Sequence, residues 1–179
     1  MESLSYLRGL PINSNLKFWF RQGERMRWID MYDSRKDTQE HITKVGELLT
    51  KLQVKLTDRK RLHDHSKLKD PEKAIFDEFT PKLKGCTYGS DEYKGYLESM
   101  KIALDHHYAE NRHHPEHFEN GIQEMNIVDI CEMIADWKAA SLRHADGDIM
   151  KSIEINQKRF GYSDELKSIL INTVKQCFD

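Results

Sequence analysis

Four polar residues stand where hydrophobic periodicity predicts the buried faces of helices. His41 precedes Leu52 by eleven residues, so its ring shares the apolar face of a helix that starts near residue 38. His63 and Asp64 are adjacent in the next helical piece, and Asp136 lies in the middle of an apolar stretch. Because a buried carboxylate or imidazole needs a polar partner, a divalent cation bound by all four side chains would satisfy them together.

Clustered histidines add further candidate ligands. The chain has nine histidines, and five of them fall within twelve residues, where even spacing would place fewer than one: His106, His107, His113, His114 and His117. One of the first pair and one of His113 and His114 could hold a second ion, and the pattern does not decide which member of each pair. The alternative is a one-metal site in which the extra histidines act as general acids or phosphate donors. We therefore expect one or two ions in each chain.

The ligand types indicate the class of metal. Imidazole and carboxylate together suit manganese, iron, nickel, cobalt or zinc better than calcium. Four protein ligands leave one or two coordination positions for water, which is typical of a catalytic site rather than a structural one. The expected cofactor is therefore a divalent transition metal used in catalysis.

The elements that must position these residues are predicted to be helices. After residue 37, apolar residues recur at three- and four-residue steps, and glycine and proline are few. The expected helical segments are 38–56, a short piece around 61–68, one that starts at Pro71, and then 90–107, 127–144, 149–160 and 163–177. We predict an all-α domain of six or seven helices over residues 38–179. An arm, residues 1–37, precedes it as a small hairpin around Gln22-Gly23 or as an irregular segment.

Composition excludes several classes of protein. A length of 179 residues fits one domain, and 28 basic against 30 acidic residues argue against general binding of nucleic acid. No run of 18 apolar residues occurs, so we expect no membrane span, and the N-terminus lacks a signal-peptide pattern. Three cysteines without close pairing indicate a reducing cytoplasm. The absence of a glycine-rich phosphate loop argues against a kinase.

The ordered set His41, His63-Asp64 and Asp136 resembles the signature of the HD superfamily of metal-dependent phosphohydrolases. The resemblance covers roughly residues 38–145, and the run Ile134-Ala135-Asp136 is similar to the sequence around that family's last ligand. It implies an HD-like helical bundle. More narrowly, residues 106–118 and 129–137 are similar to a small group of phage and bacterial proteins recorded only as a domain of unknown function. For a phage protein, the expected location is the host cytoplasm.

By this resemblance we expect a hydrolase that acts on a small phosphate ester, with a nucleotide as the favoured substrate. A metal-activated water would attack phosphorus, and a side chain would move a proton to the leaving oxygen. The candidate catalytic residues are Asp64, Lys67, His107 and His114. The candidate phosphate-binding residues are Lys67, Arg61, Arg112 and Arg143. Whether the substrate is a monoester or a diester stays open, as does a homo-oligomeric state.

Two alternatives belong to other classes of function. A few HD-fold proteins use four histidines and two aspartates to hold two irons and activate oxygen, and this chain has enough ligands for such a di-iron oxygenase. The other alternative is a non-catalytic binding module. It is favoured by Lys67, which stands three residues after Asp64, where nucleotide-cleaving relatives often carry a catalytic acid.

Overall fold

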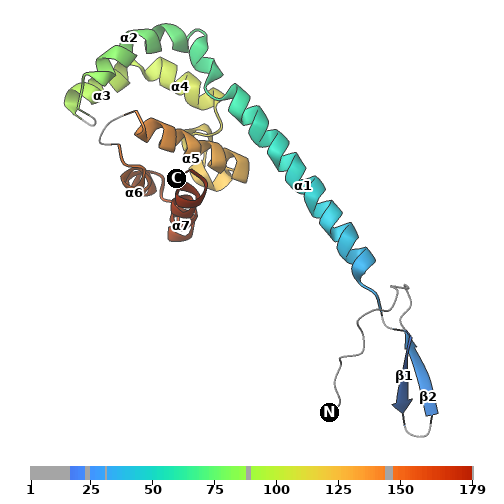
Figure 1. Cartoon of the computed structure of the whole chain (residues 1–179). Coiled ribbons are helices and arrows are strands. Elements are labelled where there is room, and N and C mark those ends of the chain that lie inside the picture. Colours follow the sequence, from blue (N-terminus) through green and yellow to red (C-terminus); the bar gives the residue numbers. More distant parts are fainter. Residues whose placement is uncertain (1–16, 23–24, 31, 88–89, 144–146, 179) are drawn as a thin grey trace. The chain divides into compact units, whose positions relative to one another are not determined.

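The computed structural model describes residues 17–22, 25–30, 32–87, 90–143 and 147–178. Strands β1 (Lys17–Gln22) and β2 (Arg25–Asp30) form an antiparallel pair, with Lys17 opposite Asp30 and Gln22 opposite Arg25 (Figure 1). Of the two forms expected for the arm, a hairpin or an irregular segment, these strands form the hairpin, and its predicted turn residue Gly23 lies outside the described residues.

Helix α1 (Arg35–Leu62) runs without a break through the end of the segment that was expected to stop near residue 56. Asp37 in its first turn, and Arg59 and Arg61 in its last turn, carry the charges that favour the two ends of the helix dipole. The chain divides into two compact units, residues 1–51 and 52–179, and the division falls within this helix. The domain boundary expected between residues 37 and 38 stays a prediction.

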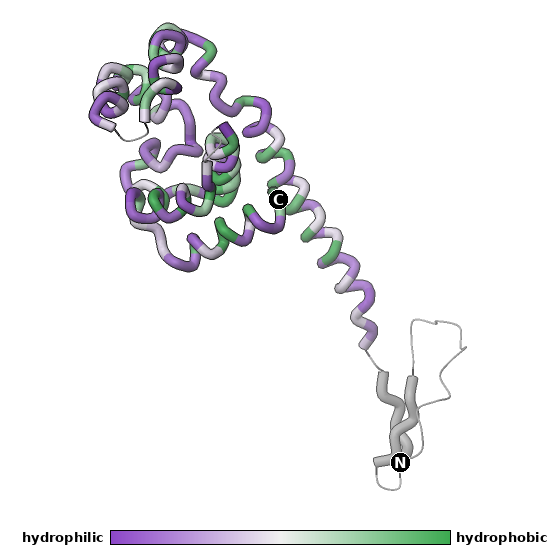
Figure 2. Tube along the Cα trace, turned by 60° about the vertical axis from the view of Figure 1, so that its left-hand side comes forward, coloured by the Kyte–Doolittle hydropathy of each residue, from purple (hydrophilic) through white to green (hydrophobic). Residues whose placement is uncertain are grey.

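The apolar face of α1 corrects one expectation. We predicted that this face, with His41, is buried, but every residue from Arg35 to Lys51 is exposed, and the exposed fraction of Leu49 is 59 %. Apolar residues recur along the helix all the same (Figure 2). Amphipathic periodicity predicts which face of a helix would be buried, but it does not say that the chain supplies a neighbour to cover that face.

The second unit continues through short helices in two groups (Figure 1). In the first group, α2 packs against α3 and α4; in the second, α6 packs against α5 and α7. The bounds are α2 (Glu72–Lys84), α3 (Asp91–Ser99), α4 (Lys101–Glu110), α5 (Ile127–Ser141), α6 (Ile149–Phe160) and α7 (Asp164–Thr173). A π-helical turn, Val174–Phe178, follows α7. The all-α prediction is confirmed by the seven helices of the described chain, although the helix expected over 90–107 is divided at Met100.

Three short 3-10 helices connect these elements. They are η1 (His65–Leu68), η2 (Pro115–His117) and η3 (Gly121–Glu124). In the described part of the chain, no helix has the length and apolar character needed to cross a bilayer.

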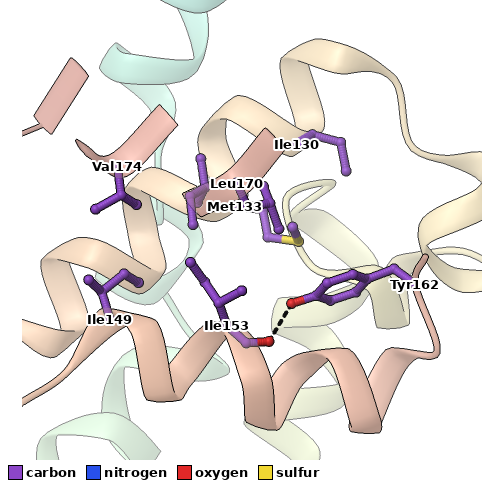
Figure 3. Close-up of a cluster of buried hydrophobic side chains, with 8 residues drawn as sticks. Ile130, Met133, Ile149, Ile153, Tyr162, Leu170 and Val174 are labelled. Atoms are coloured by element: carbon purple, nitrogen blue, oxygen red, sulfur yellow. Dashed lines mark hydrogen bonds between the residues drawn. The ribbon is translucent and has the colours of Figure 1, made fainter. Parts of the chain in front are cut away.

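The hydrophobic core lies between α5, α6 and α7 (Figure 3). Met133, Ile153 and Leu170, one from each helix, are almost fully buried, and each contributes roughly 1.5–3 kcal/mol by leaving water. The Tyr162 hydroxyl donates a hydrogen bond of 2.5 Å to the Ile153 carbonyl. This bond pairs a buried polar group and ties the loop after α6 to that helix.

Helix α5 is anchored at its start by reciprocal hydrogen bonds. The Asn126 side chain accepts from the backbone of Val128 and Asp129, and the Asp129 carboxylate accepts from the backbone of Asn126. Asp129, Glu132 and Asp136 follow at steps of three and four, so they share a face different from the face that fills the core. The helix thereby presents three carboxylates on one side.

Candidate metal centre

Asp64 lies at the middle of a cluster of histidines and carboxylates. It is the second residue after α1 and has a left-handed backbone with φ of 57°, a conformation that aspartate tolerates better than most residues. Its Oδ2 accepts a hydrogen bond of 2.7 Å from the Lys67 ammonium. Burial works to raise the pKa of Asp64, but the His107 ring and the Lys67 charge outweigh it and hold that pKa below its usual range.

The other oxygen of Asp64 faces histidine nitrogens. Its Oδ1 lies 3.3 Å from His107 Nε2 and 3.5 Å from His113 Nε2, and His114 Nε2 is 2.9 Å from His107 Nε2. The four side chains form one group that could hold a metal ion. Asp64 Oδ1 and His113 Nε2 are both buried, and neither has a hydrogen-bond partner in the part of the chain that the structure describes. Two such atoms facing each other are costly unless something between them binds both.

The Nδ1 atoms of His63, His107 and His113 contact carboxylates. Glu132 Oε1 lies 3.0 Å from His63 Nδ1 and 3.3 Å from His113 Nδ1, and Glu72 Oε2 lies 2.9 Å from His107 Nδ1. A carboxylate can only accept, so each of these Nδ1 atoms carries the proton, and the Nε2 of the neutral ring keeps a lone pair. Carboxylates of this kind orient metal-binding histidines in many proteins.

A second group shares Asp64 with the first. His63 Nε2 lies 3.7 Å from Asp64 Oδ2 and 3.6 Å from Asp136 Oδ1, and these three residues could also hold an ion. The two oxygens of Asp64 thus face different sets of side chains. Hydrogen bonding to Asp136 and then to Glu132 raises the pKa of His63 to about 10. Near pH 7 the His63 ring of the metal-free chain is therefore protonated, and its positive charge offsets the negative charges of the carboxylates around it.

His114 has the opposite electrostatic environment. Burial, followed by the neighbouring His113 and His107 rings, lowers the pKa of His114 to about 3. Its imidazole is therefore neutral near pH 7, which is the form that binds a metal. Burial works to raise the pKa of Glu132, but hydrogen bonds from His113 and His63 bring it down to about 2. The carboxylate therefore keeps its charge beside both rings.

Most of the expected ligands come together. The groups that could hold a metal include six of the eight: His63, Asp64, His107, His113, His114 and Asp136. Among the described residues, these groups do not include His41, which is exposed on α1, or His106. The His106 side chain is 40 % exposed and its Nδ1 contacts Glu72. The structure thus brings His107 of the first pair, and both members of the second pair, to the cluster.

The expected phosphate-binding residues differ in their places. Lys67 lies at the cluster through its bond to Asp64. Arg112 instead pairs with the buried carboxylate of Asp129 at 3.0 Å. Arg61 and Arg143 are exposed.

Sequence analysis missed two carboxylates of the site. One is Glu132, whose position four residues before Asp136 puts both on one face of α5 and could have identified it. Glu72 is fully buried in the first turn of α2, and no local pattern marks it. Its role depends on the packing of α2 against α4.

Comparison with protein-family models matches residues 30–176 to the family described as Family of unknown function (DUF5662). The chain belongs to this family. The matched span of DUF5662 includes the whole cluster around Asp64 and both carboxylates that orient its histidines. Membership in a family without an assigned function is thereby confirmed as expected. No curated protein and no solved structure matches the chain.

Proposed function

We propose that the cluster around Asp64 is a metal centre and that the chain is a metal-dependent phosphohydrolase of the HD type. The observation that carries the proposal is a pair of buried atoms that face each other 3.5 Å apart, Asp64 Oδ1 and His113 Nε2. Within the described residues, neither atom has a hydrogen-bond partner. A cation between them satisfies both at once. The fold brings these two atoms together from separate parts of the chain. Their position therefore supports a metal more strongly than the number of histidines in the sequence does.

The proposed ligands fall into two sets that share one carboxylate. Asp64 Oδ1 with the Nε2 atoms of His107, His113 and His114 fits a first ion. Asp64 Oδ2 with His63 and Asp136 fits a second. Nitrogen and carboxylate donors favour manganese, iron, nickel, cobalt or zinc. The order His63-Asp64 and then Asp136 keeps the HD pattern, whereas His41, the expected first ligand, departs from it.

When bound, a divalent metal of this kind lowers the pKa of water and polarises a phosphoryl oxygen. The chain itself supplies a cation beside that position. The Lys67 ammonium is one third exposed, bonds Asp64 at 2.7 Å and lies 5.2 Å from the centre of the Phe76 ring. It is placed to donate to an oxygen of a phosphate ester, of which a nucleotide is the favoured class. His107 and His114 act in this proposal as ligands rather than as acids, because their Nε2 atoms face each other.

The test compares untagged wild type, Asp64→Asn and Asp105→Asn. The last is a matched control, because Asp105 is exposed on α4 and pairs only with Lys101 in the described chain. Elemental analysis should find one or two metal ions per chain in wild type and control, and loss of metal in Asp64→Asn. With each of the five metals, hydrolysis of nucleotides and of nitrophenyl mono- and diesters should fall by about a hundredfold or more in Asp64→Asn.

The results separate the parts of the proposal. A wild-type protein that stays free of metal after reconstitution overturns the metal centre. A metal-loaded protein that cleaves no phosphate ester overturns the phosphohydrolase and favours the binding module. The expected cytoplasmic location stays a prediction.

A second candidate function is supported by the composition of the cluster. Besides Glu132, the groups that could hold a metal contain four histidines and two aspartates, the set that a few HD-fold oxygenases use for two irons: His63, His107, His113, His114, Asp64 and Asp136. Reconstitution with iron under anaerobic conditions decides between the two. A mixed-valence electron paramagnetic resonance signal together with oxygen uptake would favour the oxygenase, and phosphate release without oxygen uptake would favour the hydrolase.

A further inference from the structure

Glu72 contacts two neighbouring histidines with its two oxygens. Its side chain is fully buried, Oε1 lies 2.8 Å from His106 Nδ1, and Oε2 lies 2.9 Å from His107 Nδ1. In the described part of the chain, these two rings are its ion-pair partners, and no lysine or arginine reaches it. A buried carboxylate in this position needs both Nδ1 protons, because it has no other donor of comparable strength.

The two rings place their other nitrogens in different surroundings. His107 is almost fully buried, and its Nε2 lies within 3.3 Å of Asp64 Oδ1 and 2.9 Å of His114 Nε2. The His106 side chain is 40 % exposed and belongs to none of the groups that could hold a metal. The same carboxylate thus orients one ring into the cluster and the other outside it.

Two further groups compete at His107 Nδ1. The amide nitrogen of Asn111 lies 3.0 Å from it, and the Ser66 hydroxyl lies 3.2 Å from it. An amide N–H₂ can only donate, so it favours a ring whose proton is on Nε2, and that form cannot bind a metal through Nε2. The Ser66 hydroxyl can either donate or accept a hydrogen bond, so it is compatible with both tautomers. Among the groups at Nδ1, only Glu72 requires the proton to be there. At the other nitrogen, Asp64 Oδ1 lies 3.3 Å from Nε2 and favours the opposite tautomer, so the proton stays on Nδ1 only because the contact with Glu72 is shorter, at 2.9 Å.

We propose that Glu72 is a positioning residue that holds the His107 proton on Nδ1 and so leaves the buried Nε2 of this ring free to bind the metal. The role in metal binding rests on the proposed metal centre, whereas the position of the proton is a property of the metal-free chain.

The test uses Glu72→Met, which removes the acceptor at similar volume, and His106→Ala, which removes the other partner of Glu72. Imidazole nitrogen-15 spectra of the metal-free proteins at pH 8, assigned with His107→Gln, report the tautomer of His107. We expect Nδ1–H in wild type and in His106→Ala, and Nε2–H in Glu72→Met. The affinity for zinc, from competition with a chelating dye, should fall 10- to 100-fold in Glu72→Met and stay within about threefold in His106→Ala.

Glu72→Gln gives an intermediate case, because its carbonyl oxygen can accept from only one of the two rings. It should lose less zinc affinity than Glu72→Met and retain part of the Nδ1–H signal. Circular dichroism checks that each variant is folded. If Glu72→Met is not folded, the nitrogen-15 spectra of the wild type and of Glu72→Gln test the position of the His107 proton.

Three results would overturn the proposal: a His107 proton on Nε2 in the wild type, an unchanged tautomer in Glu72→Met, or an equal loss of zinc affinity in His106→Ala. A wild type that binds no zinc but shows the tautomer change would overturn the metal centre and the ligand role of His107, while the hold of Glu72 on the proton would stand. A zinc protein that depends on Glu72 but hydrolyses nothing would overturn only the phosphohydrolase.

Discussion

The two faces of α5 are both covered by protein, but they are held in different ways. One face contributes Ile130, Met133 and Ile134 to an apolar core with α6 and α7. The other contributes Glu132 and Asp136 to the histidine cluster, where contacts have specific donors and acceptors at 3.0–3.6 Å. Dispersion forces between apolar groups have no preferred direction, whereas each polar contact needs one particular partner atom.

This difference indicates which amino-acid substitutions each face of α5 tolerates. A core tolerates a substitution that conserves volume, because a new methyl group can occupy the space of the old one. In the cluster, even a change of one atom from oxygen to nitrogen reverses a hydrogen bond. We therefore expect substitutions in the core to lower stability without changing metal binding. Substitutions in the cluster should weaken metal binding and change the stability of the metal-free protein less.

The largest expected effect on stability comes from the core face. Met133 is fully buried, and Met133→Ala should lower the free energy of unfolding by about 3 kcal/mol, because it leaves a cavity. Urea denaturation of the metal-free protein measures this change. Met133→Leu, which conserves volume, should cost less than about 1.5 kcal/mol. Both should bind as much zinc as the wild type, and a loss of zinc in the folded alanine variant would contradict the separation of the two faces.

The cluster face should respond to Glu132→Gln. Glu132 Oε1 contacts both His63 and His113, and Oε2 accepts a hydrogen bond from Arg59. Glutamine has one accepting oxygen for these three partners and no charge, so the affinity for zinc should fall 10- to 100-fold, which corresponds to about 1.4–2.7 kcal/mol. Zinc at a hundred times its dissociation constant should stabilise the wild type by about 2.7 kcal/mol. At the same zinc concentration, Met133→Ala should keep this increment, and Glu132→Gln should retain about 0.4–1.4 kcal/mol of it. Glu119→Gln, at an exposed position, is the control. Equal increments in all variants would sink the comparison.

The smallest effect sharpens the comparison inside the core. Burial raises the pKa of Tyr162 to about 12, so the folded chain holds this proton more tightly than the unfolded chain does. The stability that follows is complete below pH 10 and is lost as the pH rises toward 12. Tyr162→Phe should cost about 1 kcal/mol at pH 8, because the bond to the Ile153 carbonyl is lost. Urea denaturation should show the gap between wild type and variant narrowing from pH 9 to pH 11; a constant gap would contradict this assignment.

Periodicity predicted much of the fold, because helices leave a repeat of 3.6 residues in the sequence. It identified the core face of α5 and placed Asp136 on a covered face. It failed at His41, because the apolar side of α1 has no cover in the described chain. A repeat in the sequence describes one helix, whereas burial depends on a second element.

The site was predictable as far as the residue types and their order allowed. The adjacency of His63 and Asp64, and the clustering of histidines, identified the region. The choice between His106 and His107 depends on which of the two rings the packing of α2 on α4 buries, and Glu72, which contacts both rings, lies 34 residues before the first. A single sequence contains no trace of such a pairing.

The left-handed backbone of Asp64 has a consequence for mutational tolerance. Glycine and asparagine adopt this conformation at the lowest cost, whereas a β-branched residue is strained there. Neither of the two well-tolerated replacements carries a carboxylate. A library of variants at this codon that is sorted for folded protein should therefore enrich the very residues that a library sorted for metal retention discards.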